Sequence, residues 1–189
     1  GKNAEGINEL VLADEGIRFD ASLDKLAGLK PVTDGGVITA GNASQITDGA
    51  AAVMICNDAG LKKIQSNPRA EIVSISVVGD DPVFMLTGPI PASKKALEAA
   101  GLSIDDMDLY EVNEAFAVVP MAFMKELKIP REKINVNGGA CSLGHPIGAS
   151  GARILVSLIN SLSLRGLKKG VAAICIGGGE ALAIAIEVD

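Results

Sequence analysis

The sequence predicts an α/β fold with a five-stranded, mixed, mostly parallel sheet covered by helices on both faces. Three observations support this prediction. Short apolar runs alternate with helical patterns over most of the chain, as in βα units of a parallel sheet. Hydrophobic residues make up 48% of the chain and the mean hydropathy is +0.34, which fits a sheet buried on both faces. A glycine triplet joins the last two apolar runs, so one antiparallel strand is expected.

Each predicted element has a local signal. The strands are short apolar or β-branched runs, over residues 50–56, 71–78, 108–112, 171–176 and 181–188. The helices are predicted over residues 59–65, 92–100, 114–127 and 145–164. Pro91 and Gly101 suit the two ends of the second helix, and Pro146 suits the first turn of the last.

The chain divides into two regions by composition. Residues 1–47 are polar and irregular, apart from leucines at helical spacing at Leu23, Leu26 and Leu29. We expect this region to be an excursion that packs on the core. Residues 48–189 are expected to form one α/β domain, because this length is sufficient for a hydrophobic core.

Charge and composition exclude several classes of protein. The net charge is −6, aromatic residues are 3%, and Lys and Arg form no dense run, which argues against nucleic-acid binding. No apolar run is long enough to span a bilayer. Three cysteines without a C-x-x-C pair, together with one histidine, predict no metal site. They indicate free thiols in a reducing compartment, so we expect a cytoplasmic protein.

His145, the only histidine, follows Gly144 and precedes Pro146. Glycine allows close approach of the backbone, and proline favours a helix start, so the ring is expected at a helix N-terminus. The helix dipole would keep the imidazole neutral and able to act as a base or hydrogen-bond donor. The alternative is a helix-capping or surface histidine.

Cys175 ends an apolar run and is followed by Gly177, Gly178 and Gly179. The glycines leave space beside the thiol, and their N–H groups could hold an oxyanion. The alternatives are a core thiol and a permissive hairpin turn, and a core thiol is also expected for Cys56.

Asn113 lies between a predicted strand and a predicted helix. It could direct its carboxamide at an oxyanion, or it could be an ordinary N-cap. The small residues of the run 41–51 could line a ligand channel or pack tightly, and this run lacks the ending of a phosphate loop.

Five motifs in order resemble the thiolase family of acyl-CoA acetyltransferases. They are G-N-A-S-x-x-x-D-G-A-A at 41–51, G-P-x-P-A at 88–92, N-E-A-F within 113–117, G-H-P-x-G at 144–148 and C-x-G-G-G at 175–179. The resemblance implies a thiolase C-terminal domain. It covers only the C-terminal half of the family pattern, because no counterpart of the segment with the acylated cysteine is found. Cys141 is interpreted as a packing variant.

The resemblance also implies roles for individual residues. His145 would activate the nucleophilic cysteine of the missing N-terminal half and, with a water held by Asn113, bind a thioester oxygen. Cys175 would exchange the α-proton of the substrate, and the Gly177 N–H would share the second oxyanion hole. Positions that touch the pantetheine arm or line the channel would be Ser44, Ala40, Ile46, Met85, Ala115 and Phe116.

The implied reaction is ping-pong acyl transfer: condensation of acetyl-CoA, thiolysis of 3-ketoacyl-CoA, or both. It requires no cofactor beyond CoA and acyl-CoA as substrates, and this chain alone is expected to be inactive. The implied partners are the N-terminal half and, for the complete enzyme, further copies in a homodimer or homotetramer. Mitochondrial and peroxisomal thiolases would carry the same motifs, so these two compartments are alternatives to the cytoplasm. The alternatives are another condensing enzyme of the superfamily and a non-catalytic CoA-binding or assembly module.

Overall fold

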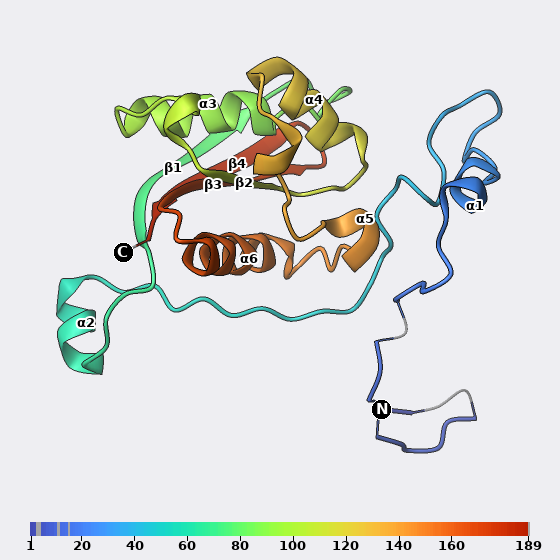
Figure 1. The fold of residues 1–189 in the computed structure, drawn as a ribbon, viewed down its shortest axis with the longest axis horizontal. Helices are drawn as coiled ribbons and strands as arrows, with labels where there is room; N and C mark the ends of the chain where they lie inside the picture. Colours follow the sequence, from blue (N-terminus) through green and yellow to red (C-terminus); the bar gives the residue numbers. More distant parts are fainter. Residues whose placement is uncertain (3–4, 11, 15, 189) are drawn as a thin grey trace.

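The computed structural model describes residues 1–188 except 3–4, 11 and 15. Its core is a four-stranded sheet in the order β1-β4-β3-β2 (Figure 1). The strands are β1 (Glu71–Gly79), β2 (Leu109–Val112), β3 (Lys169–Ile176) and β4 (Glu180–Glu187). β4 is antiparallel to both β1 and β3, and β2 is parallel to β3. The predicted mixed α/β sheet is therefore confirmed, but the predicted count of five strands is wrong.

The missing strand is the predicted one over residues 50–56. This segment is extended, but no described residue pairs with it, and Met54 and Ile55 are 76% and 71% exposed. Figure 1 shows it running beneath α6 towards α2 (Asp58–Ile64), away from the sheet. An apolar run favours a strand only where a neighbouring strand can accept its hydrogen bonds, and within the described residues this one has none.

Helices cover both faces of the sheet, as predicted. α3 (Pro89–Ala99) and α4 (Val118–Leu127) lie on one face and α6 (Ser150–Arg165) on the other (Figure 1). The first face holds the larger core, where the rings of Tyr110 and Phe123 meet edge to face with centroids 5.7 Å apart. On the second face, Leu158 and Leu162 of α6 are fully buried against β2 and β3.

Two predicted helices begin later than expected. α4 starts at Val118 rather than at residue 114, because the backbone of residues 115–117 bonds instead to an earlier segment: Ser44 N donates to Ala115 O (3.0 Å) and Ala117 N to Asn42 O (2.8 Å). α6 starts at Ser150 rather than at His145, so Pro146 does not lie in its first turn.

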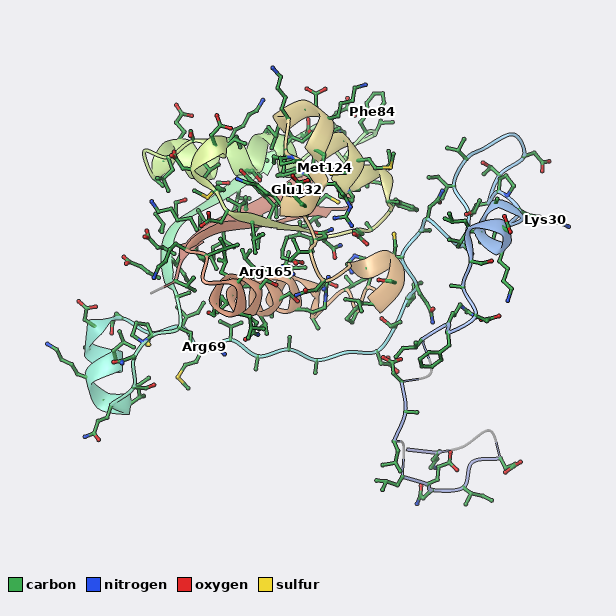
Figure 2. All side chains as sticks on the ribbon, in the orientation of Figure 1. Lys30, Arg69, Phe84, Met124, Glu132 and Arg165 are labelled. Carbon is green, nitrogen blue, oxygen red and sulfur yellow. The ribbon has the colours of Figure 1, made fainter. Side chains whose placement is uncertain are left out.

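The remaining elements are short. They are α1 (Leu23–Ala27), α5 (Ala140–Leu143), and two 3-10 helices, η1 (Ile104–Asp106) and η2 (Arg131–Lys133). α1 buries none of its residues and lies apart from the sheet (Figure 1). Near the start of β1, Arg69 Nη2 donates to Asn160 Oδ1 on α6 (3.0 Å; Arg69 is labelled in Figure 2). The division at residue 47 stays a prediction.

The turn between β3 and β4 should depend on Gly179. This residue is buried, has φ +95°, and a Cβ there would strike Asp80 O and lie 3.1 Å from Pro82 Cα. We expect Gly179→Ala to lower the free energy of unfolding by about 1–3 kcal/mol, measured by urea denaturation. Gly177→Ala in the same turn is the control, because no atom lies within 4 Å of its Cβ position. Equal midpoints for the two variants would contradict this account.

Candidate active site

The candidate residues gather where the parallel strands end. β1, β2 and β3 run in the same direction, so their carboxyl ends share one edge of the sheet. Asn113 follows β2 directly, and its N–H donates to Ala173 O of β3 (3.0 Å). Cys175 lies near the end of β3. This edge is where open α/β sheets usually bind ligands.

Asn113, His145 and Ser150 form a chain of hydrogen bonds. His145 Nε2 lies 3.2 Å from Asn113 Nδ2, and His145 Nδ1 lies 2.6 Å from Ser150 Oγ. The Ser150 hydroxyl donates to Pro146 O (3.1 Å), so it accepts from the ring. This assigns the proton of the neutral ring to Nδ1 and leaves the Nε2 lone pair to accept from the Asn113 amide. Nε2 is thereby the basic nitrogen.

The pKa of His145 is lowered, first by burial and then by the positive charge of Arg153. The expected neutral imidazole therefore agrees in direction with the structure, but the expected cause is wrong. His145 precedes α6 by a turn of residues instead of lying in its first turn. The folded state binds the His145 proton more weakly than the unfolded chain does. The contribution of His145 to the free energy of unfolding therefore decreases as the pH falls below 6.5.

An extended segment, residues 42–45, joins three of the predicted motifs. Its Ser44 N donates to Ala115 O (3.0 Å), and Ala43 forms a β-bridge with Phe116. Its Gln45 O accepts from His145 N (2.8 Å). The predicted pantetheine and channel residues Ser44, Ala115 and Phe116 are thus neighbours, each half-buried, beside the hydrogen-bonded chain.

Two other predicted binding residues do not join this group. Ala40 and Ile46 flank the segment but are exposed, and the Ile46 side chain is 87% exposed. No described contact connects either of them to Asn113 or His145. They stay predictions from the motif alone.

Cys175, Gly177 and Met85 form a second group at the same edge. Cys175 is half-buried, and burial raises its thiol pKa. Gly177 is exposed in the turn after β3, and the loop with Met85 packs against this turn, where Asp80 N donates to Gly179 O (2.6 Å). Among the described residues, no hydrogen bond connects this group to Asn113 or His145.

Two hollows lie near these groups. One, of about 360 Å³, is lined by residues 47–51 and 146–149 and adjoins the loop after His145. The other, of about 190 Å³, is lined by residues that include Glu114, Met124 and Cys141. Neither of these two hollows is lined by Asn113, His145 or Cys175.

Glu114 ties the loop after β2 to α5. Its carboxylate accepts from Asn135 Nδ2 (2.8 Å) and from Cys141 N (3.1 Å). Cys141 is half-buried, with Sγ 3.6 Å from Asn42 O. Burial and the charge of Glu114 raise the pKa of this thiol to about 11, which favours the protonated thiol at neutral pH.

Sequence reasoning missed Ser150, Glu111 and Arg153. Ser150 could have been found from its place in a small-residue run five positions after His145. Glu111 is a charged residue within an apolar strand, which is itself a signal. Within the described part of the chain, no three His, Cys, Asp or Glu residues gather as a metal-ion site would require.

Comparisons with known proteins agree with the motifs. A model of the thiolase C-terminal domain matches residues 66–188, and a model of the thiolase N-terminal domain matches residues 1–59. An acetyl-CoA acetyltransferase of Shinella zoogloeoides is 52% identical over 176 residues, 93% of this chain and 45% of the relative. A steroid 3-ketoacyl-CoA thiolase of Mycobacterium tuberculosis is 50% identical over 174 residues, 92% of this chain and 42% of the relative.

The fold is similar to that of solved thiolases. Human mitochondrial 3-ketoacyl-CoA thiolase superposes with a TM-score of 0.89 at 48% identity, over 93% of this chain and 45% of that one. A structure of human mitochondrial 3-ketoacyl-CoA thiolase in complex with CoA gives a TM-score of 0.87 at 45% identity, over 95% and 46%. The chain belongs to the thiolase family. It spans about half the length of the curated relatives it matches.

The match at residues 1–59 corrects one expectation. The sequence analysis assigned the chain to the C-terminal half alone, but the first third of the chain matches the N-terminal domain of the family. The expectation rested on the segment with the acylated cysteine, and residues 1–59 carry no counterpart of that segment.

The hydrogen bond to Ser150 should set the tautomer of His145. In Ser150→Ala the ring loses the acceptor for its Nδ1 proton, so we expect a larger share of the Nε2–H tautomer, measured from ¹⁵N shifts of the neutral ring. Ser163→Ala is the control, because the Ser163 hydroxyl bonds only within α6, to Ile159 O (2.9 Å). An unchanged tautomer ratio in Ser150→Ala would show that Ser150 does not hold the ring proton.

Proposed function

We propose that the chain is part of a thiolase that transfers acyl groups between acyl-CoA and CoA by a ping-pong mechanism. The observation that carries the proposal is the chain Asn113–His145–Ser150, which leaves the imidazole neutral with Nε2 as its base. It supports condensation of acetyl-CoA and thiolysis of 3-ketoacyl-CoA equally, because both use the same groups.

We further propose that the acylated cysteine lies outside these 189 residues, in the part of the relatives that the chain does not span. Cys56 precedes α2, which Figure 1 places far from the hydrogen-bonded chain. Cys141 has a raised pKa and packs beside Glu114. Cys175 is assigned another role, so no cysteine of this chain suits the nucleophile. This chain alone should therefore be inactive.

His145 would serve the acylation step. When the Asn113 amide gives up its hydrogen bond to His145 Nε2, that nitrogen takes the proton of the nucleophilic thiol. The thiolate attacks the thioester carbonyl, and the departing CoA thiolate recovers the proton from the imidazolium. Burial favours the neutral ring at the start of this cycle. The Asn113 Oδ1 atom is buried and has no described partner, so it can accept from a water that donates to the thioester oxygen of the second substrate.

Cys175 would exchange the α-proton. In thiolysis the thiol donates its proton to the α-carbon as the carbon–carbon bond breaks, and in condensation the thiolate removes that proton. The raised pKa of Cys175 suits a proton donor at neutral pH. The N–H of Gly177, exposed in the adjoining turn, would stabilise the oxyanion of the acyl-enzyme together with the N–H of the nucleophile.

The apolar face of β1 supports association with the rest of the enzyme. Ile75 and Val77 are 58% and 54% exposed, and α6 packs on β2 and β3 instead of covering them. A protein domain rarely leaves such a row in water. We propose that the remaining part of the thiolase covers it and that the complete enzyme forms a homodimer or homotetramer.

CoA and acyl-CoA are proposed as substrates, with no further cofactor. Among the described residues no helix is long and apolar enough to cross a membrane. The proposal of a cytoplasmic location rests on the three free thiols.

The first test is thiolysis of acetoacetyl-CoA, followed by loss of the enolate absorbance. This chain is assayed alone and mixed with a polypeptide that supplies the missing part of a relative. We expect activity only in the mixture. Activity of this chain alone would overturn the proposed place of the nucleophile. Association without activity would favour the non-catalytic CoA-binding module.

Cys175→Ala tests the division of roles in the active mixture. We expect condensation and thiolysis to fall by roughly 10²–10⁴-fold, because the α-proton loses its exchange partner. Acylation of the nucleophile by acetyl-CoA should be partly retained, measured by mass spectrometry of the acyl-enzyme. Cys56→Ala is the control and should change neither step. Equal loss of acylation and condensation in Cys175→Ala would refute the assignment.

A further inference from the structure

Asn135 is a buried polar residue that the proposed mechanism does not use. It is 2% exposed, and its backbone has φ +45°, a left-handed conformation that asparagine adopts more readily than most residues. Both its main chain and its carboxamide bond to the outer edge of β2. Asn135 N donates to Tyr110 O (2.9 Å), and the carboxamide accepts from Val112 N and donates to Val112 O, each at 2.8 Å. The carboxamide thus continues the bonding of this edge beyond the isolated bridge between Tyr110 and Ile134.

The peptide unit between Val112 and Asn113 is held from both sides. Its carbonyl oxygen, Val112 O, accepts from Asn135 Nδ2 (2.8 Å), and its N–H, on Asn113, donates to Ala173 O of β3 (3.0 Å). Because a peptide unit is planar, bonds at its two ends fix its orientation. The direction in which the Asn113 side chain leaves β2 therefore depends on Asn135.

Glu114 connects Asn135 to the segment that precedes His145. Asn135 Nδ2 donates to Glu114 Oε1 (2.8 Å), and Glu114 Oε2 accepts from Cys141 N (3.1 Å). Cys141 N lies in the first turn of α5, where backbone N–H groups have no acceptor within the helix. α5 ends two residues before His145. The Glu114 carboxylate thus holds the helix that leads directly to the ring.

A glycine at the start of α5 allows this contact. Gly139 is buried and precedes the first residue of α5, and a Cβ built there would collide with the Glu114 carboxylate. The carboxylate therefore lies directly against the backbone of residue 139. This close packing leaves Glu114 little freedom to move away from Asn135 and α5.

We propose that Asn135, through Val112 and Glu114, sets the position of the Asn113 amide relative to His145 Nε2. The inference rests on the proposed function, in which Asn113 and His145 act together. Asn113 lies between the two residues that the Asn135 carboxamide binds, and one of them also holds the helix before His145. Both ends of the 3.2 Å contact between Asn113 Nδ2 and His145 Nε2 thus depend on one carboxamide. Asn135 acts through other residues, so it is a positioning residue.

Asn135→Gly tests the inference in this chain alone. Glycine tolerates φ +45°, so the variant removes the carboxamide without straining the backbone. His145 is the only histidine, so its ring gives a single set of ¹⁵N resonances. At about pH 8 the ring is neutral, because its pKa is lowered from 6.5. We expect the Nε2 resonance to shift from its wild-type position towards that of Asn113→Ala, the variant that lacks the amide.

Asn137→Gly is the matched control, because the same substitution two positions later removes a side chain that bonds to α6. Its partners are Ser161 Oγ (2.8 Å) and Arg165 Nη2 (3.4 Å). The control should leave the ring resonance in place. A resonance of Asn135→Gly at the wild-type position would overturn the proposal. An unmoved resonance in Asn113→Ala would overturn it as well, because the ring would then have no bond to the amide.

An exchange of partners tests the link through Glu114, and it decides the question if Asn135→Gly fails to fold. Asn135→Asp keeps the acceptor for Val112 N but replaces the donor to Glu114 with a second carboxylate. Glu114→Gln, added to that variant, restores a donor between the two side chains. We expect the double variant to bring the ring resonance and the thermal midpoint closer to wild type than Asn135→Asp does. A double variant no closer to wild type would overturn the proposal.

A kinetic readout separates this inference from the proposed function. In the active mixture, Asn135→Gly should lower kcat by roughly 10–100-fold with little change in KM, and Asn137→Gly should change neither. A mixture inactive with the wild-type chain would refute the proposed function and leave the ring resonance, measured in this chain alone, to decide the role of Asn135. An active mixture in which Asn135→Gly alters neither kcat nor the resonance would refute that role alone.

Discussion

The parallel pairing of β2 with β3 is the constraint on which the candidate site depends. Val112 lies opposite Ala173, and Asn113 N–H continues the ladder to Ala173 O at 3.0 Å. This register fixes the position of Asn113, directly after β2, relative to Cys175 near the end of β3. Both strands are buried on both faces, so a slip by one residue would send Glu111 into the apolar core under α3 and α4.

The outer edge of β2 is covered by an isolated parallel bridge between Tyr110 and Ile134 and by the side chain of Asn135. Asn135, held at φ +45°, accepts from Val112 N and donates to Val112 O, each at 2.8 Å. It also donates to Glu114, which in turn holds the start of α5. The side chains of Asn135 and Glu114 therefore provide hydrogen-bond partners for backbone groups of β2 and α5. This allows a strand edge to be buried, because unpaired backbone groups would be costly there.

The other side of the site is formed by a segment that matches the N-terminal domain of the family, whereas Asn113 and His145 match the C-terminal domain. Residues 42–45 fall within the match to the N-terminal domain, yet they bond to Ala115, Ala117 and His145 of the C-terminal match. The site is therefore formed where the two domain models meet. The exposed apolar residues of β1 and of residues 53–55 are further surfaces that the chain presents without cover of its own.

The sequence alone determined the alternation of strands and helices, the glycine hairpin and the order of the motifs. These are local properties, since burial on two faces, turn geometry and residue spacing act within a few positions. Only the tertiary structure decided that residues 50–56 stay unpaired, because a strand depends on a distant partner. It also decided that residues 114–117 leave helical geometry to bond to residues 42–44. The protonation of His145 also depends on tertiary structure. The fold brings Ser150 to the ring, which sets the tautomer, and burial together with the charge of Arg153 lowers the pKa. These groups are not adjacent to His145 in the sequence, so a local argument from the helix dipole does not include them.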